Sequence, residues 1–472
     1  MGKADAVVVG AGPNGLAAAI TLARAGVSVV VLEAEATIGG GVRSAELTLP
    51  GFTHDICSSI HPFGYASPFF RSLPLEQFGL RWIEPPAPAG HPFEDGRVMV
   101  VEHSLEETCA ALGQDGQAYA SLLAPAREAW NALLAARTPL EAFPKILAAQ
   151  KPARKALGSA CKVATRSFAR PETRALFAGM AGHSMLPLEK AGTAGVALGL
   201  LVTAHAGGWP FPQGGAQKLS DALAGYLRTL GGEIRTGCRV SDLRELVSHR
   251  AVLLDLTPRQ IVAMAGALFP ERYLRALRRY RYGIAAYKMD WALSDPVPWR
   301  SAELRRTATL HLGGSLEEIA AAERAAWNGS ACERPFVLAA QHSLFDATRA
   351  PSGKHTLWGY CHVPSGSEVD MSERVEAQIE RFAPGFRDCI LARSVMTPRA
   401  LESHNANLVG GDISGGVQDL WQSLIRPTLG YWKTPLSNVY ICSSSTPPGV
   451  GVHGMCGYVA ARLVLKKVFS AS

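Results

Sequence analysis

Three glycines near the start of the chain have a spacing that predicts a ligand-binding turn. They form the pattern Gly10-x-Gly12-x-x-Gly15. An apolar run precedes them and a helical pattern follows, which is the context in which such a turn binds a dinucleotide. Gly10 permits the tight turn, Gly12 lets the backbone approach a pyrophosphate, and Gly15 permits close packing of helix on strand. The phosphates are expected at the helix N-terminus, where free N–H groups and the helix dipole favour anions.

An acidic residue and a second glycine cluster indicate which dinucleotide is bound. Glu33 ends the second apolar run, where a carboxylate accepts hydrogen bonds from ribose hydroxyls and repels a 2′-phosphate, so NADP is not expected. The run Gly39-Gly40-Gly41-Val42-Arg43-Ser44 follows it. A dinucleotide with a ribityl chain and an isoalloxazine ring needs this further close approach of the backbone. The sequence therefore predicts FAD as the cofactor.

The C-terminal region repeats the glycine spacing as Gly449-x-Gly451-x-x-Gly454, between a strand pattern and a helix pattern. No second strand and no acidic residue follow it, so it is not expected to be an independent NAD site. We expect this loop to bring a helix N-terminus against the pyrimidine end of the flavin, where it would stabilise negative charge on the ring.

An ordered set of motifs resembles the phytoene desaturase-like FAD oxidoreductases. They are VVVGAGPNGLAAA, VLEAEATIGGGVRS, LPGFTHD, WPFPQGGAQKLSDAL, GGDISGG and YICSSSTPPGVGVHGMCGYVAARLVL. The set covers both ends and the middle of the chain. It is specific for an FAD fold and much less so for a substrate. The chain departs from the pattern at Gly41, where many relatives have arginine, and at Ser443-Ser444-Ser445.

The resemblance implies a set of cofactor-binding residues. Arg43 would contact a phosphate or the flavin, with a surface salt bridge as the alternative. The other expected contacts are Gly10, Gly12, Pro13, Asn14 and Gly15 at the pyrophosphate, Glu33 with its neighbour Ala34 at the adenosine ribose, Gly40, Gly41 and Ser44 on the ribityl side, Val240 in a short strand facing the adenine, and Ser444, Gly451, Val452, His453 and Gly454 at the flavin ring.

Three apolar segments far apart in the sequence are expected to share one sheet. Residues 6–32 read as strand, turn, helix and strand, and the runs 251–256 and 438–442 read as further strands. The runs are continuously apolar, as in parallel strands covered on both faces. A discontinuous domain would unite them, and we predict a FAD-binding domain of residues 1–75, 210–262 and 400–472, with a substrate-binding domain of 76–209 and 263–399.

The two inserts differ in pattern. The first, 76–209, is rich in Ala, Leu and Pro and is predicted to be helical, whereas the second contains strand candidates at 285–293, 336–340 and 356–363. The predicted fold class is α/β, with a discontinuous Rossmann-like domain of the glutathione-reductase type. An α+β substrate domain with a mixed sheet and a helical lid completes it.

Two residues are candidates for acid–base catalysis. His453 interrupts the glycine loop expected beside the flavin, and imidazole titrates near neutral pH. The alternative is a histidine hydrogen-bonded to backbone in a tight loop. Asp412, within GGDISGG, is the second candidate, with capping of a turn or helix as the alternative.

Three side chains of the segment WGYCHVP are candidates for contact with the substrate. Trp358, Tyr360 and His362 alternate along a predicted strand and would share one face. They would line the substrate cavity or, alternatively, pack in the core.

Charge and cysteine usage bear on partners and compartment. The net charge is +7 and no basic tract is interleaved with aromatic residues, so no nucleic-acid partner is expected. The nine cysteines are scattered and contain no CxxC pair, so neither a metal site nor a disulfide framework is expected. A strand pattern begins within the first residues and leaves no room for a signal peptide. A cytoplasmic location is therefore predicted.

Two segments raise the question of membrane contact. The arginine run within 272–281 reads as a solvated helix face or as a contact for anionic lipid headgroups. The apolar stretch 191–206 is too short to span a membrane and reads as a buried helix or as the lining of an apolar tunnel. Peripheral membrane contact is therefore a hypothesis, and the oligomeric state stays open.

These features together predict an FAD-dependent enzyme that desaturates, saturates or isomerises a carbon–carbon double bond of a lipophilic substrate, such as a polyene, an isoprenoid or an acyl chain. A flavin amine oxidase acting on a C–N bond is the alternative enzyme. A non-catalytic lipid-binding escort, like the prenyl-binding guanine-nucleotide dissociation inhibitors, is the alternative of another class, and it would not need the intact glycine turn and Glu33.

Overall fold

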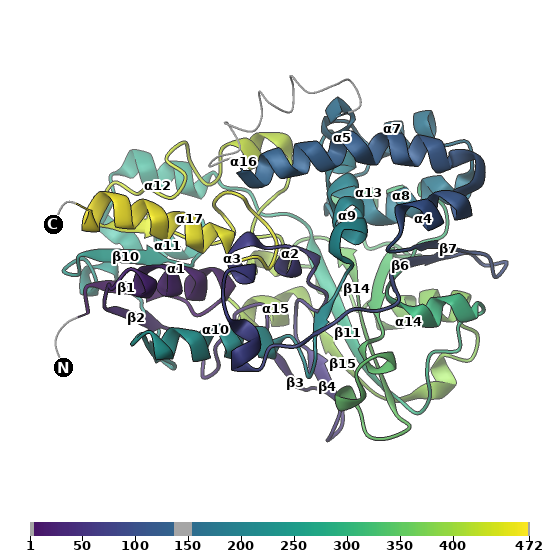
Figure 1. The fold of residues 1–472 in the computed structure, drawn as a ribbon, viewed down its shortest axis with the longest axis horizontal. Helices are drawn as coiled ribbons and strands as arrows, with labels where there is room; N and C mark the ends of the chain where they lie inside the picture. The colour runs from purple at the N-terminus through teal and green to yellow at the C-terminus, as the bar shows by residue number, and fades with distance from the viewer. Residues whose placement is uncertain (1–3, 136–152, 471–472) are drawn as a thin grey trace.

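A parallel five-stranded sheet contains the N-terminal glycine turn. The computed structural model describes residues 4–135 and 153–470 (Figure 1). The strand order is β16-β10-β1-β2-β9, and every neighbouring pair is parallel. The prediction that the three remote apolar segments share one sheet is confirmed. The strands are β1 (Ala6–Val9), β2 (Val29–Leu32), β9 (Glu233–Arg235), β10 (Ala251–Leu254) and β16 (Val439–Ile441).

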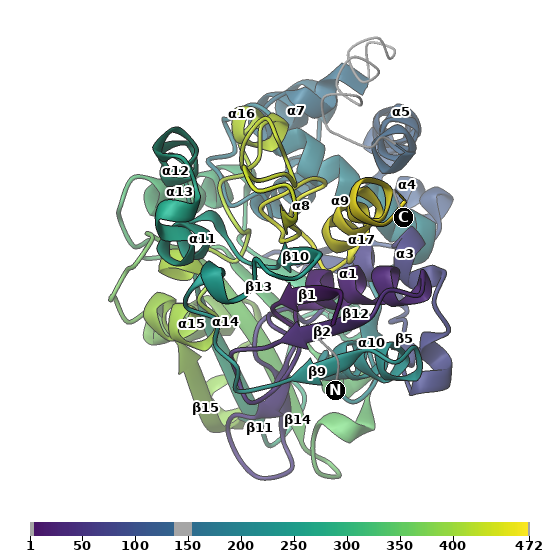
Figure 2. The same ribbon diagram turned by 90° about the vertical axis from the view of Figure 1, so that its left-hand side faces the viewer.

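Helices cover both faces of this sheet, which is why its central strands are apolar throughout. One face packs on α1 (Pro13–Arg24), α10 (Gln217–Thr229) and α17 (Met455–Val464). The other packs on α11 (Pro258–Ala265) and α12 (Glu271–Arg278). Figure 2 views this layered arrangement from the side of the five-stranded sheet.

The first and last helices of this domain lie side by side (Figures 1 and 2). A Cβ added at Gly457 of α17 would lie 1.8 Å from the carbonyl oxygen of Asn14 in α1. A Cβ added at Gly15 would likewise lie 2.0 Å from the carbonyl oxygen of Gly10. Glycine is therefore required at both positions by close packing, as expected for Gly15.

A mixed seven-stranded sheet forms the second half of the molecule, at the right of Figure 1. Its order is β15-β11-β14-β13-β12-β6-β7, with β12 and β6 parallel and the other pairs antiparallel. The strands are β6 (Ala87–Pro92), β7 (Val98–Val101), β11 (Ala285–Leu293), β12 (Thr307–Leu312), β13 (Val337–Ala340), β14 (His355–Val363) and β15 (Ile390–Met396).

Side chains alternate between the two faces of this sheet. Ala286, Leu338 and Tyr360 join a core with a helical layer, and their neighbours Tyr287, Val337 and Cys361 pack toward α14 (Ser372–Phe382) on the opposite face. The helical layer consists of α4 (Leu105–Leu112), α5 (Gly116–Ala135), α7 (Ala160–Ser167), α8 (Pro171–Gly182), α9 (Thr193–Gly207) and α13 (Leu316–Trp327).

Short elements connect the two halves. Two small antiparallel pairs join β3 to β4 and β5 to β8. The short elements are α2 (Pro62–Tyr65), α3 (Pro68–Arg71), α15 (Pro398–His404), α16 (Leu420–Leu424), β3 (Ser44–Glu46), β4 (Thr53–Asp55), β5 (Trp82–Ile83) and β8 (Phe211–Pro212).

The secondary structure differs from expectation mainly in the first insert. It contains β5, β6 and β7 as well as helices, so the purely helical prediction for 76–209 is wrong in part. The three strand candidates of the second insert are confirmed as β11, β13 and β14, whereas β12 and β15 were not predicted. The apolar stretch 191–206 falls in α9, whose central residues are buried, as expected for a buried helix. The domain boundaries stay a prediction.

No helix within the described ranges is long and apolar enough to pass through a lipid bilayer.

Candidate functional site

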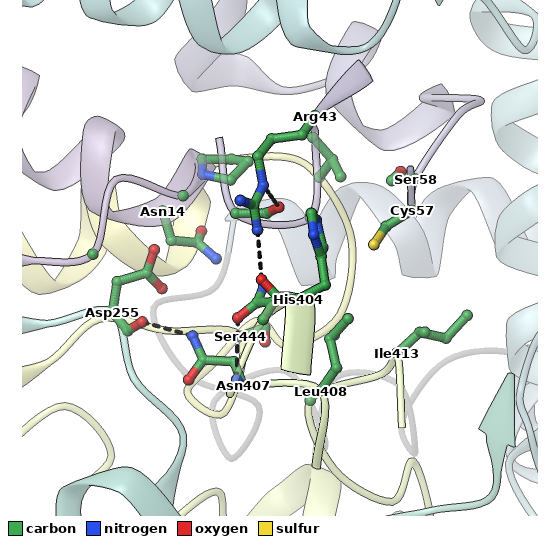
Figure 3. Close-up of a pocket in the computed structure, with 18 of the residues that line it drawn as sticks. Asn14, Arg43, Cys57, Ser58, Asp255, His404, Asn407, Leu408, Ile413 and Ser444 are labelled. Carbon is green, nitrogen blue, oxygen red and sulfur yellow. Dashed lines mark hydrogen bonds between the residues drawn. The ribbon is translucent and has the colours of Figure 1, made fainter. Parts of the chain in front are cut away.

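A cavity of about 630 Å³ joins the two halves of the molecule. One end lies at the carboxyl ends of β1, β2 and β10, where parallel α/β sheets bind ligands. The other end reaches the seven-stranded sheet through Ala286, Lys288, Thr309, Leu338 and Tyr360. Figure 3 shows Asn14 and Asp255 at one side of this pocket and Cys57 and Ile413 at the other. We call the first part the nucleotide end and the part on the seven-stranded sheet the chamber.

The nucleotide end is shaped for a group that approaches backbone closely. Gly10, Gly12, Pro13, Asn14, Gly40 and Gly41 all line it. A Cβ added at Gly40 would lie 3.2 Å from the Cα of Gly12, so these two turns are already in contact. The buried Oδ1 atom of Asn14 has no hydrogen-bond partner within the described ranges. A ribose hydroxyl could donate to this oxygen, and the close glycine backbone leaves room for a pyrophosphate, so the residues fit a dinucleotide.

Glu33 lies where a ribose-binding acid is expected. Its side chain is 8% exposed and faces the cavity together with Ala34. Oε2 accepts a hydrogen bond from the backbone N–H of Ala11 (2.7 Å), and Oε1 accepts one from Glu35 (3.0 Å). These bonds hold the carboxylate in place and leave further acceptor capacity for ribose hydroxyls.

Asp255 was not predicted as a site residue. It follows β10 and lies beneath the first turn of α1, where its Oδ2 accepts a hydrogen bond from the backbone N–H of Gly15 (2.9 Å). Burial raises the pKa of this carboxyl to about 7, and the charge of Glu33 adds to the rise. Asp255 also lines the cavity. A titratable carboxyl group therefore lies next to the turn where the phosphates are expected.

Arg43 bridges two loops beside the nucleotide end (Figure 3). Its Nε donates to the carbonyl of Gly40 (2.9 Å) and its Nη2 donates to the carbonyl of His404 (2.8 Å). The side chain is only 5% exposed, so the alternative of a surface salt bridge is wrong. Its guanidinium lines the cavity, and its contact with a cofactor stays a prediction.

The C-terminal glycine loop reaches the same cavity. Val450, Gly451, Val452 and Ser444 line it together with the N-terminal glycines, so the two turns meet in space as expected. Val240 also lines the cavity, but it does not lie in a strand, because β9 ends at Arg235 and residues 236–242 are irregular. Gly454 lies outside the lining. It is the N-cap residue of α17, and a Cβ there would lie 2.6 Å from Phe70.

His453 does not face the cavity. Its Nδ1 accepts a hydrogen bond from the backbone N–H of Met455 (3.0 Å), and its carbonyl accepts one from Ser67 (2.7 Å). Burial lowers the pKa of the imidazole to about 4, so it is neutral near pH 7. The geometry therefore favours the alternative, a histidine that orders the tight loop before α17.

Asp412 is likewise a structural residue in this geometry. The side chain is fully buried and lies outside the cavity lining. Its carboxylate accepts hydrogen bonds from three backbone N–H groups, those of Gly283 (2.7 Å), Ser414 (2.6 Å) and Gly416 (3.0 Å). These bonds fix a turn, which was the alternative reading, and leave the carboxylate no access to a substrate in the cavity.

Ser44 turns away from the cavity into a buried ionic cluster. Its hydroxyl donates to Asp55 (2.7 Å) because β3 begins at Ser44 and places the side chain beside β4. Asp55 also binds both terminal nitrogens of Arg349 (3.1 and 3.0 Å), and Arg349 reaches Asp346 as well (3.2 Å). The positive charge of Arg349 holds the pKa of Asp55 well below its usual range against the opposing effect of burial. This cluster holds the loop after Arg43 in place.

The chamber contains a buried lysine. Lys288 on β11 lines the cavity, is 2% exposed and donates a hydrogen bond to Asp290. Burial raises the pKa of Asp290 to about 6, against the lowering by Lys288. His54 lies 3.6 Å from the same carboxylate. Lys288 and Asp290 thus form a buried ion pair at the chamber wall.

The three predicted substrate contacts have different surroundings. Trp358 and Tyr360 line the cavity, with ring centroids 5.2 Å apart. His362 continues the same face of β14, at 5.5 Å from Tyr360, but lies outside the lining. Its Nδ1 is 2.7 Å from a carboxylate oxygen of the buried Glu323. The alternative of core packing therefore fits His362, whereas Trp358 and Tyr360 stay candidate contacts.

Comparison with known proteins supports the nucleotide-binding half at the level of sequence. A family model described as an NAD(P)-binding Rossmann-like domain matches residues 8–73. The chain is similar to a rat protein called pyridine nucleotide-disulfide oxidoreductase domain-containing protein 2, at 24% identity over 98% of this chain and 93% of the rat protein. It is also 26% identical to a phytoene desaturase (neurosporene-forming) of Rhodobacter capsulatus, over 52% of this chain and 51% of that one.

Solved structures extend the similarity to the whole chain. An oxidoreductase from Methanosarcina mazei matches with a TM-score of 0.67 at 17% identity, covering 98% of this chain and all of the other. A putrescine oxidase variant matches with a TM-score of 0.62 at 16% identity, covering 99% of each chain. The chain has the fold of a flavin oxidoreductase. The similarity is too distant to place it in the phytoene desaturase-like family, and the glutathione-reductase type also stays a prediction.

Two residues that matter in the geometry carried weak sequence signals. Asp255 is the acidic residue within the apolar run AVLLDL, and its place at the carboxyl end of a strand beside β1 could have indicated a ligand site. Lys288 lies within the strand candidate 285–293, where a lysine between apolar residues indicates a polar partner or a cavity.

Proposed function

We propose that this protein is an FAD-dependent oxidoreductase that acts on a carbon–carbon double bond of a lipophilic substrate. The observation that carries the proposal is the single cavity that joins the nucleotide end to the chamber. When bound, FAD supplies hydride chemistry at a flavin ring nitrogen. The protein contributes the binding site and the orientation of the substrate, and it keeps water away from the reacting carbon.

The residues present define how the cofactor would be held. Gly12, Asn14 and Gly40 would surround the pyrophosphate, and the carboxylate of Glu33 would accept hydrogen bonds from the ribose hydroxyls. The loop at Gly451 would lie at the flavin ring. Arg43, with two of its donors used by carbonyl groups, would place positive charge beside the cofactor without leaving its position.

The distribution of charge favours a substrate without a positive charge. Among the described lining residues the acidic ones are Glu33, Glu35 and Asp255, and all three lie at the nucleotide end. The charged group that lines the chamber is Lys288, which would repel an ammonium group. The remaining lining residues of the chamber are mainly apolar or aromatic, and they suit a hydrocarbon skeleton.

Lys288 is the chamber residue best placed to handle a proton. Desaturation, saturation and isomerisation all require a proton to leave or reach a substrate carbon, or a charge to be stabilised there. The ammonium group of Lys288 donates a hydrogen bond to the buried carboxylate of Asp290, and this contact fixes its position at the chamber wall. We propose that Lys288 faces the reacting end of the substrate.

Oxidation of an amine is the second candidate, because two aromatic rings line the chamber. Trp358 and Tyr360 present a surface that could hold a cationic amine through cation–π contact. The putrescine oxidase of the same fold acts on an amine, as its name states. The non-catalytic escort has no comparable observation in its favour, because the nucleotide end retains the features of a binding site.

Flavin content and reduction test the proposal directly. The purified protein is denatured, and the released cofactor is identified by chromatography against FAD and FMN standards. The intact protein is then mixed anaerobically with a polyene, an isoprenoid, an acyl substrate or an amine while the flavin absorbance is recorded. Bleaching by a member of the first three classes, or reoxidation of the reduced protein by one, is the expected result.

A matched pair of variants ties the cofactor to the cavity. Gly12→Val places a side chain whose Cβ would lie 2.8 Å from Asp255, so it should remove the flavin. Ala321→Val, at an exposed position on α13, makes the same kind of change away from the cavity and should retain it. A colourless wild-type protein would support the escort instead, and bleaching by amines alone would support the second candidate.

A further inference from the structure

The width of the chamber can be estimated from one row of directly paired residues that crosses the seven-stranded sheet. Lys288 of β11 lies opposite Tyr360 of β14, Tyr360 lies opposite Leu338 of β13, and Leu338 lies opposite His311 of β12. Directly opposed residues share a face, and strands lie about 4.8 Å apart, so Lys288 and His311 are separated by about 14 Å. The charge of Lys288 acts on His404, whose carbonyl accepts a hydrogen bond from Arg43 beside the nucleotide end. His311 therefore marks the opposite end of the chamber.

A pair of histidines lies at this distant end. His183, which follows α8, lines the cavity, and its Nε2 is 2.9 Å from the Nε2 of the fully buried His311. Burial lowers the pKa of His183 to about 3 and holds that of His311 well below its ordinary value, so both rings are neutral. One ring donates and the other accepts. Trp209 packs against both rings, with centroid distances of 5.7 and 6.1 Å.

The surroundings of His311 select the direction of this hydrogen bond. The Nδ1 atom of His311 is buried and has no partner within the described ranges. A buried N–H without an acceptor costs more than a ring nitrogen without a donor. The proton of His311 is therefore on Nε2 and is donated to His183. His183 then carries its own proton on Nδ1, which makes no hydrogen bond to the described residues and is available to the cavity.

A second polar group without a partner lies close by. Thr309, two residues before His311 on the same face of β12, lines the cavity and is 4% exposed. Its hydroxyl oxygen has no hydrogen-bond partner within the described ranges. A buried hydroxyl without a partner is costly, and because this one lines the cavity, a bound ligand atom could satisfy it. Leu200, Trp209 and Leu338 supply the apolar surroundings.

We infer that His183 and Thr309 form a subsite for a neutral oxygen atom, a carbonyl or hydroxyl group, at the far end of an otherwise lipophilic substrate. Two neutral donors among apolar side chains match such an oxygen better than a carboxylate, which would need a positive charge. The inference rests on the proposed function in taking the chamber as the substrate site. It makes the oxygen a binding handle three strands away from Lys288 rather than the reacting group. His311 is a positioning residue, because it acts through His183.

Ligand binding can be measured without turnover. Trp209 and Trp358 both line the cavity, so tryptophan fluorescence reports its occupancy. The purified protein, with its flavin content recorded, is titrated with methyl nonyl ketone and with undecane, which has the same number of carbon atoms and no oxygen. The measured quantity is the change of each Kd between wild type and variant, because the two probes differ in solubility.

Two threonines provide a matched comparison. Thr309→Val removes the hydroxyl that lines the cavity. Thr356→Val removes another buried hydroxyl without a partner, on β14, which lies outside the lining. One lost hydrogen bond corresponds to about a three- to tenfold weaker Kd. We expect this loss for the ketone with Thr309→Val, no change for undecane, and no change of either Kd with Thr356→Val.

His183→Phe is the second test, because it keeps the ring packed against Trp209 but removes the donor. It should raise the Kd of the ketone about tenfold and leave that of undecane unchanged or lower. The inference is overturned if the ketone does not bind to the wild type, or if Thr309→Val and Thr356→Val have the same effect. A preparation without flavin would overturn the proposed function instead, since the fluorescence titration does not depend on the cofactor.

Discussion

Asp255→Asn should make the stability of the protein less dependent on pH. Burial raises the pKa of this carboxyl from 3.8 to about 7. Each pKa unit corresponds to about 1.4 kcal/mol, so ionising Asp255 in the folded protein costs about 4 kcal/mol more than in the unfolded chain. Between these two pKa values the folded protein binds the additional proton. The free energy of unfolding therefore falls as the pH rises from about 4 to 7, and the full penalty is present above pH 7.

The assay is urea unfolding of wild type and variant at pH 5 and pH 8. At pH 5 the wild-type penalty is about 1.7 kcal/mol and at pH 8 about 4 kcal/mol, as the two pKa values require. Asparagine can still accept the hydrogen bond from Gly15 and carries no charge. The stability gained by Asp255→Asn should therefore be about 2.5 kcal/mol greater at pH 8 than at pH 5. If the cavity takes FAD, the variant should also retain it better above pH 7.

Asp370→Asn is the control. The pKa of Asp370 is lowered to about 2 because Tyr287 and Ser372 donate hydrogen bonds to it. Its stabilising effect is fully present above the ordinary pKa of 3.8 and is lost only as the pH falls toward 2. Asp370→Asn should thus change stability equally at pH 5 and pH 8. An equal effect of Asp255→Asn at the two pH values would refute the reasoning.

Three further changes have definite expected outcomes. Gly457→Ala would place a Cβ 1.8 Å from a carbonyl oxygen of α1, so it should lower both the melting temperature and the flavin content. Gly41→Ala is the control, because an added Cβ there meets nothing within 4 Å, and it should leave the melting temperature unchanged. Arg349→Met should destabilise the protein by about 3–5 kcal/mol in urea unfolding because it leaves two buried carboxylates without their ionic partner. Arg244→Met, at an exposed pair, should leave the stability nearly unchanged. If the basic face of α12 contacts membranes, the protein should co-sediment with phosphatidylserine vesicles at low salt and be released at high salt, and retention in the supernatant at low salt would exclude this contact.

The nucleotide-binding half could be predicted from sequence because several signals agree there. The apolar runs, the glycine spacing and Glu33 all point to the same βαβ unit. The seven-stranded sheet carried weaker signals. β6 reads APAGHP, and two prolines with a glycine give no strand signal, since proline cannot donate to the sheet. Its strand conformation comes from pairing with β7, which follows it closely in the sequence, and with β12, which is remote in the sequence.

The candidate site was predicted better for backbone than for side chains. The spacing of glycines indicates where the backbone must closely approach a ligand or another segment, and the predicted glycine turns do line one cavity. A histidine or an aspartate in a loop does not report which way it points. His453 and Asp412 turned out to bind backbone groups, whereas His183 and Lys288 face the cavity from elements whose neighbours in space are remote in sequence.

The contact between α1 and α17 sets the order in which the protein can mature. The cavity wall at residues 450–452 and the helix that packs on the first turn of α1 are synthesised only after both inserts. While a ribosome is still translating the inserts, the N-terminal glycine turn lacks that wall. Any dinucleotide captured by this cavity can thus be enclosed only after translation has passed Gly457, so its enclosure must follow the synthesis of both inserts.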